Sequence, residues 1–190
     1  MSRRIADQAT HGEVEVRRWR PEDGAELRAV ILSSDAHLRP RMAWLDLWAP
    51  ADCDPAATVD GWNAEWEDGG DLYVGIFERG TIAGAGGLHR RLGPDALEIG
   101  YWLGAHATGR GLATIAGGLL TDLAFVDPSI GRVRIAHDIT NVPSEGVPRR
   151  LGYALIGELA CERTLGPADT GTDRIWEVTR AAWPGYASLA

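Results

Sequence analysis

A glycine-rich segment in the middle of the chain has the residue types that a phosphate-binding loop needs. Gly109 and Gly111 flank Arg110 and stand directly before apolar residues with helical spacing. Glycines let the backbone approach a ligand closely, and the first turn of a helix has amide groups without partners inside the helix. Arg110 could add a charge-assisted hydrogen bond to a phosphate. For this loop alone, an ordinary connection between a strand and a helix is the alternative.

Polar residues on either side of the loop could transfer protons. Glu98 lies in the otherwise apolar segment 96–103, where a carboxylate is a candidate general base. Its alternative role is a structural carboxylate bonded to the backbone or to an arginine. Ser144 starts a short helical segment and is either a hydrogen-bond donor to a reacting group or the helix cap. His89 ends a predicted strand, and we expect it at the surface, with assistance to a base as its alternative role.

Composition limits the partners of the chain. It has 190 residues, of which 45% are hydrophobic and 24% charged, which suits one globular domain. Arginine supplies all 19 basic charges against 27 carboxylates, so the net charge is −8. The absence of lysine excludes mechanisms that need one, such as a pyridoxal Schiff base. The acidic balance argues against binding to nucleic acid or anionic membranes and favours cationic small molecules or basic peptides.

Neither a metal site nor a secretory signal is expected. Cys53 and Cys161 form no CxxC pair, and the five histidines never occur at HxxxH spacing. Basic residues at the N-terminus are not followed by an apolar stretch, and no run is apolar enough to span a bilayer. We therefore expect a cytoplasmic protein with reduced cysteines.

The order of predicted elements indicates a single α/β domain. Residues 1–12 are polar and are expected to form a flexible lead-in to a domain over 13–190. The domain is predicted to have a mixed, mostly antiparallel central sheet flanked by helices. Strands are expected near 14–16 and over 72–78, 81–88, 96–103, 132–136, 153–161 and 174–180. Helices are expected from Pro21, over 58–68, after Gly111 and over 143–151, with an irregular apolar segment at 34–57.

Several motifs together resemble one known family. The segment 106–114, His-Ala-Thr-Gly-Arg-Gly-Leu-Ala-Thr, resembles the acyl-CoA pyrophosphate loop of the GNAT superfamily of N-acetyltransferases. Segment 98–103, Glu-Ile-Gly-Tyr-Trp-Leu, resembles the preceding strand in the ribosomal-protein N-terminal acetyltransferase branch. Residues 141–144, Asn-Val-Pro-Ser, with Leu-Gly-Tyr at 151–153, are similar to a third motif of that branch. Residues 37–40 with Trp44 resemble its substrate-side helical region.

The resemblance implies an acetyl-CoA-dependent N-acetyltransferase without a metal. Glu98 would be the general base, and Ser144 would donate to the leaving thiolate. Contacts to acetyl-CoA are expected from Tyr101, Trp102, Leu103, His106, Thr108, Gly109, Arg110, Gly111, Leu112, Ala113, Thr114 and Asn141. The substrate pocket is expected to include His37, Arg39, Trp44 and Trp48. The acceptor would be an amine-bearing antibiotic or metabolite or a protein N-terminus, and a second copy of the chain is a candidate partner.

The sequence also departs from the family pattern. His106 stands where Gln or Arg is usual, and Pro148 stands where many relatives have a tyrosine proposed to protonate the leaving thiolate. Gly146 and Pro148 predict that the helix over 143–151 is short or distorted. Tyr153 is expected to pack at the start of a strand rather than to replace the missing acid. These departures keep a second hypothesis open, a non-catalytic acyl-CoA-binding or regulatory protein.

Overall fold

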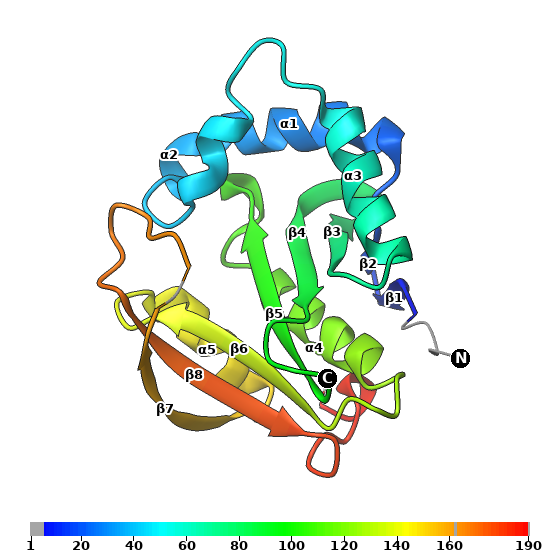
Figure 1. The fold of residues 1–190 in the computed structure, drawn as a ribbon, viewed down its shortest axis with the longest axis vertical. Coiled ribbons are helices and arrows are strands. Elements are labelled where there is room, and N and C mark those ends of the chain that lie inside the picture. The colour runs from blue at the N-terminus through cyan, green and yellow to red at the C-terminus, as the bar shows by residue number, and fades with distance from the viewer. Residues whose placement is uncertain (1–5, 162, 190) are drawn as a thin grey trace.

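The computed structural model describes residues 6–161 and 163–189, which form one eight-stranded sheet with helices on both faces (Figure 1). The strands lie in the order β1-β2-β3-β4-β5-β6-β8-β7, and β5 and β6 are the parallel neighbours. The predicted fold class, a single α/β domain with a mixed, mostly antiparallel sheet, is confirmed. The strands are β1 (Gln8–His11), β2 (Val14–Arg18), β3 (Leu72–Glu78), β4 (Thr81–His89), β5 (Ala96–Leu103), β6 (Arg132–Asp138), β7 (Ala154–Ala160) and β8 (Thr172–Thr179).

Two apolar cores cover the two faces of the sheet. On one face α4 (Leu112–Ala124) packs against β1, β2, β4 and β5, with α5 (Val142–Arg150) beside it. On the other face α1 (Gly24–Ser33) packs against β4, and α3 (Pro55–Glu67) packs against β3. Alternate residues of β3 serve the two cores, since Val74 joins the α4 core and Tyr73 the α1–α3 core. The short helix α2 (Asp35–Leu38) and a 3-10 helix (Ala43–Leu47) lie beyond α1.

The sheet is split between its two parallel strands. Residues 96–99 of β5 pair with residues 132–135 of β6, and pairing between these strands ends there. The remainder of β5 stays paired with β4, and the remainder of β6 stays paired with β8. The two strands therefore diverge, as Figure 1 shows, and leave backbone groups unpaired on both sides of the gap.

Some local expectations were wrong. Residues 8–11, inside the expected lead-in, form the edge strand β1 and pair with β2, whereas residues 1–5 lie outside the described residues. This strand is polar and partly exposed, so it has no apolar alternation that a sequence pattern could detect. The segment 34–57, expected to be irregular, contains α2 and the 3-10 helix. Within the described residues no helix is long and apolar enough to cross a membrane.

Candidate active site

The gap between β5 and β6 opens into a cavity of about 880 Å³. Gly100, Tyr101 and Trp102 of β5 line it from one side, and His137 and Asp138 of β6 from the other. Further predicted site residues reach the same cavity, namely Trp44, Trp48, Glu98, Asn141 and Ser144. The split sheet thus brings together residues that are up to 100 positions apart in the sequence.

The predicted phosphate loop lies directly beyond β5 and forms the entry to α4. Gly109 and Gly111 have left-handed backbone angles, with φ of 73° and 79°, and a Cβ on either would meet no atom within 4 Å. Gly111 is the N-cap of α4, and the amide of Thr114 is bonded to its carbonyl at 2.9 Å. The turn therefore requires glycine for its conformation and leaves open space in front of the helix N-terminus.

Side chains of the loop are already held by other parts of the fold. The guanidinium of Arg110 donates to the carboxylate of Glu78 at 2.6 Å, and His106 Nε2 donates to the Ile82 carbonyl at 3.1 Å. The hydroxyl of Thr114 accepts from Nε of Arg150 at 3.0 Å, and Leu112 is buried in the α4 core. None of these residues lines the cavity. The loop offers a ligand its backbone more than its side chains.

Pro148 lies inside α5 and changes its hydrogen bonding without ending it. A proline has no N–H, so the Ser144 carbonyl, four residues earlier, has no partner from position 148. The hydroxyl of Tyr101, from β5, donates to that carbonyl at 3.2 Å. Burial raises the pKa of Tyr101, so the hydroxyl remains a donor. The helix cap is Asn141 and not Ser144, which is the third residue of the helix.

One ion pair and one hydrogen bond hold the polar residues at the start of β5. Glu98 is mostly buried and its carboxylate lies 3.0 Å from the guanidinium of Arg91. His89, directly opposite Glu98 in the β4–β5 register, has its Nδ1 2.7 Å from the Asp71 carboxylate. The side chain of His89 is only 17% exposed and lines the cavity, so its expected surface position was wrong. His89 is the last residue of β4, and it lies next to the point where β5 and β6 separate.

Aromatic rings form the acceptor-side wall of the cavity. The rings of Trp44 and Trp102 are 5.9 Å apart, and Trp48 lies 5.9 Å from Trp62. Trp62 in turn stacks on Tyr73 at 5.2 Å. Trp44 and Trp48 both line the cavity, and their contact with an acceptor stays a prediction. These rings supply a rigid apolar surface for the part of an acceptor that does not react.

His37 and Arg39 do not belong to this wall, which corrects the sequence prediction. Both side chains are exposed, and neither lines the cavity. Arg39 pairs with Asp35 at 2.6 Å and with Asp46 at 2.9 Å. The short helix α2 turns these two residues outward, and Arg41, after its end, reaches the cavity instead.

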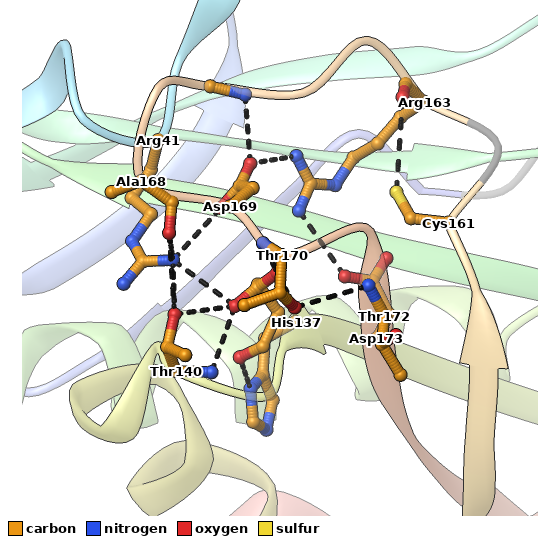
Figure 2. Close-up of polar contacts among 12 residues, drawn as sticks. Arg41, His137, Thr140, Cys161, Arg163, Ala168, Asp169, Thr170, Thr172 and Asp173 are labelled. Atoms are coloured by element: carbon orange, nitrogen blue, oxygen red, sulfur yellow. Dashed lines mark hydrogen bonds and ion pairs between the residues drawn. The ribbon is translucent and has the colours of Figure 1, made fainter.

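Arg41 joins three segments that are distant in sequence (Figure 2). Its Nη1 donates to the Thr140 hydroxyl at 2.9 Å, to the Asp169 carboxylate at 3.0 Å and to the Asp138 carboxylate at 3.3 Å. Arg163 also donates to Asp169, at 2.6 Å. The loop between β7 and β8 is thereby fastened to the segment after α2 and to the end of β6. Arg41, Asp138, Arg163 and Asp169 of this network line the cavity.

Asp138 is the most buried acid of this network, with 1% of its surface exposed. Burial alone would raise the pKa of Asp138. The amides and hydroxyls of Thr140 and Thr170 donate to its carboxylate at 2.6–2.9 Å and hold that pKa well below its usual range. Asp138 therefore stays ionised and serves as a fixed anchor for the loops around it.

Sequence reasoning missed several cavity residues, and only His89 carried a usable signal. His89 ends a strand next to the one that contains Glu98, which is enough to suggest a shared face. Arg41, Tyr73 and Arg163 carried none, because their approach to the cavity depends on contacts between distant segments.

The split sheet, the cavity between its diverging strands and the glycine turn at the start of α4 define the class of protein: an acyltransferase domain with an α/β fold. The family model described as the acetyltransferase (GNAT) domain matches residues 13–154. The chain therefore belongs to the GNAT family of acetyltransferases, as its motifs indicated.

Relatives of known name support this membership. The chain is 26% identical to "Putative ribosomal N-acetyltransferase YdaF" of Bacillus subtilis (strain 168) over 142 residues, which cover 74% of this chain and 77% of that protein. RimJ of Mycobacterium smegmatis, in complex with a CoA disulfide, has a TM-score of 0.81 at 23% identity and covers 93% of this chain and 87% of its own. The structure of the Microcin C7 self immunity acetyltransferase MccE, in complex with acetyl-CoA and AMP, has a TM-score of 0.79 at 22% identity. The match covers 89% of this chain and 93% of the MccE chain.

Proposed function

We propose that this protein transfers the acetyl group of acetyl-CoA to the N-terminal amine of a peptide or protein, with ribosomal proteins as the first candidates. The observation that carries the proposal is the cavity in the split sheet, with a carboxylate and aromatic rings on its walls, together with the open glycine turn that follows β5 in the chain. The name of the Bacillus subtilis relative supports the acceptor, and the ligands of the RimJ and MccE structures support the donor.

The described residues fit acetyl-CoA at two places. The open turn at Gly109 and Gly111 can admit a pyrophosphate to the amides at the start of α4, where the helix dipole favours an anion. Unpaired backbone groups of residues 100–103 can bond the amides of the pantetheine arm, and Asn141 stands on the opposite side of the gap. When bound there, acetyl-CoA would supply an activated acyl group as a thioester.

Glu98 and Ser144 are the proposed polar groups of the reaction. Glu98 presents a carboxylate to the cavity, which can attract a cationic amine or take its proton. Ser144 stands across the gap on α5 and can donate to the departing thiolate, a role that Pro148 cannot fill. The bond from Tyr101 to the Ser144 carbonyl fixes the backbone that presents this hydroxyl.

Proton arithmetic favours α-amines over lysine side chains. An α-amine with a pKa near 8 is roughly one-tenth neutral at pH 7, whereas a lysine amine with a pKa near 10.4 is neutral in about one molecule in a few thousand. A site with modest base assistance therefore acts better on an N-terminus. An amine-bearing small molecule is the second candidate, because an aromatic-walled cavity of about 880 Å³ can enclose one.

Release of CoA thiol across an amine panel tests the function. The panel contains an N-terminally free peptide, the same peptide blocked at its N-terminus but containing lysine, and amino sugars. We expect acetylation of the free peptide at the highest kcat/KM. Preference for the blocked peptide would contradict the choice of acceptor, and absence of turnover with every amine would favour a protein that only binds acyl-CoA.

The cofactor site has a matched test. Gly111→Trp should weaken acetyl-CoA binding by at least about tenfold in calorimetry, because a bulky side chain would fill the open turn. Gly69→Trp is the control, since Gly69 has a similar φ of 86° and equally open surroundings but lies between α3 and β3. Both variants suffer the same backbone strain, so equal affinities would contradict the placement of the cofactor.

A further inference from the structure

His89 lies at the point where the sheet begins to split. Gly87 and Gly100 face each other across β4 and β5, and a Cβ on Gly100 or Gly87 would lie 3.0 or 3.3 Å from Nε2 of His89. The imidazole therefore extends over this glycine pair, which has no side chains to displace it. Gly100 is the first residue of β5 after its pairing with β6 ends, so Nε2 is at the opening between the strands.

Asp71 sets the orientation of the ring. Its Oδ2 lies 2.7 Å from Nδ1 of His89, and its Oδ1 accepts from the amide of Arg90 at 2.7 Å. Burial alone would raise the pKa of Asp71, but these two hydrogen bonds outweigh burial and lower it. The ionised carboxylate therefore accepts Nδ1–H, which leaves the lone pair of the neutral ring on Nε2.

The other cavity histidine shows the contrast. Nε2 of His137 accepts from the indole of Trp176 at 3.1 Å, and its Nδ1 donates to the Asp138 carbonyl at 2.9 Å. Both nitrogens of His137 are thus engaged within the fold. For Nε2 of His89, the described residues provide no hydrogen-bond partner. Of these two rings, His89 is the one that can accept a proton from a bound molecule.

Charged and titratable groups around His89 come from several elements. They are Asp71 directly before β3, Tyr73 of β3, Glu98 of β5, Arg90 and Arg91 from the turn after β4, and Glu65 of α3, whose carboxylate accepts from the Asp71 amide. Tyr73 meets the imidazole edge-on, with ring centres 5.7 Å apart. The carboxylate of Glu98 is paired with Arg91 at 3.0 Å, whereas Nε2 of His89 has no hydrogen-bond partner among the described residues.

We propose that His89 is the general base of the reaction and that Asp71 is the residue that positions it. The proposal rests on the proposed function and assigns its proton-transfer step. Glu98, paired with Arg91, then serves to attract the cationic acceptor rather than to take its proton. An aspartate that holds one nitrogen of a histidine while the other faces the substrate is a recurring arrangement for base catalysis.

The proton balance of the step is complete. Nε2 of His89 takes one proton from the ammonium group, and the lone pair this frees forms the C–N bond to the thioester carbonyl. The C–S bond breaks with its electron pair on sulfur, and the second N–H proton goes to the thiolate through the Ser144 hydroxyl or water. His89 returns its proton to solvent as the amide leaves.

Chemical rescue tests the assignment with the full chain. His89→Ala should lower kcat at pH 7 by about 100-fold or more, the usual contribution of a general base, while acetyl-CoA affinity in calorimetry stays within about twofold. Added imidazole should raise the kcat of His89→Ala at least about tenfold. In His89→Ala, kcat should rise about tenfold per pH unit until the acceptor amine deprotonates by itself near pH 8. His37→Ala, on the exposed surface of α2, is the matched control and should keep the wild-type rate.

Two further variants separate the outcomes. His89→Gln retains the size of the side chain if His89→Ala does not fold, and should be equally slow. Asp71→Asn should lower kcat by about tenfold and should not be rescued by imidazole, because the ring is still present. Full activity of folded His89→Ala or His89→Gln in an active wild-type background would overturn the base assignment alone. A wild-type chain without turnover on any amine would overturn the proposed function, and this assignment with it.

Discussion

Charged side chains around the cavity are held by fixed partners, and this decides what each can do. Glu98 is bonded to Arg91, His89 to Asp71, and Arg41 to Asp138 and Asp169. A group whose partner is already in place presents its charge or lone pair in one direction and needs little reorganisation when a substrate binds. At this scale the cavity contains a positioned imidazole and a positioned carboxylate, side by side in the β4–β5 register.

Glu98→Gln separates attraction of the acceptor from proton transfer. We expect the KM for a peptide amine to rise about tenfold, equivalent to about 1.4 kcal/mol, because a neutral amide no longer attracts the ammonium group. The kcat value should change by less than about threefold. Asp95→Asn, at an exposed acid just before β5, is the control. A 100-fold loss of kcat at unchanged KM in steady-state kinetics would instead make Glu98 the base.

At the scale of elements, α5 is coupled to β5 across the gap in the sheet. Pro148 removes one bond inside the helix, and Tyr101 supplies a replacement from the opposite strand. In a helix with a complete set of internal bonds, the carbonyl of residue 144 would already accept a hydrogen bond from the amide of residue 148. Pro148 thus leaves the helix with a carbonyl that attaches it to the strand that lines the cavity.

A double-mutant cycle measures this coupling. Tyr101→Phe should lower the free energy of unfolding by about 1–2 kcal/mol, because the Ser144 carbonyl loses its donor. In a Pro148→Ala background the new amide can bond that carbonyl, so the same change should cost about 1 kcal/mol less. Tyr153→Phe is the control, since its hydroxyl bonds Thr121 at 2.7 Å. Equal costs of Tyr101→Phe in both backgrounds, measured by urea unfolding, would contradict the coupling.

Elements with a local signature could be predicted from the sequence. The hairpin of β3 and β4, the strand β5 and the glycine turn before α4 each depend on neighbouring residues, and all were placed correctly. Glu98 and Ser144 were also chosen as site residues from their neighbours in the sequence, and both line the cavity. Strand β1 and the side chain of Arg41 depend on partners elsewhere in the chain, so the local pattern did not reveal them. Arg39 and Arg41 are both arginines beside a short helix, and only the tertiary contacts decide which one faces the cavity.

At the scale of the whole molecule, buried and paired acids connect the site to the stability of the fold. Asp138 and Asp169 line the cavity, Asp71 holds the cavity histidine His89, and Asp23 pairs with Arg17. Burial alone would raise the pKa of each of the four, but their hydrogen bonds outweigh burial and lower it. The folded state therefore binds fewer protons in acid than the unfolded chain does.

The sign of the pH dependence follows from these lowered pKa values. An acid with a lowered folded-state pKa stabilises the fold above its unfolded pKa, near 3.9, and this contribution disappears as the pH falls through that value toward the folded pKa. We expect the free energy of unfolding in urea to be nearly constant from pH 7 to about 5 and to fall steeply below about 4. Each such acid adds up to about 1.4 kcal/mol per pH unit to the slope.

Asp138→Asn tests which acids produce the slope. The variant should be less stable at pH 7 by about 3 kcal/mol, because a buried ionic partner of Arg41 is lost. Below pH 4, the slope of its free energy of unfolding against pH should be smaller by the contribution of about one proton. Its stability should therefore approach that of the wild type as the pH falls. Asp52→Asn, at an exposed position before α3, should leave both the stability and the slope unchanged. Parallel curves for Asp138→Asn and the wild type would show that Asp138 does not contribute to the acid sensitivity, and that the loops around the cavity are held by its shape and not by its charge.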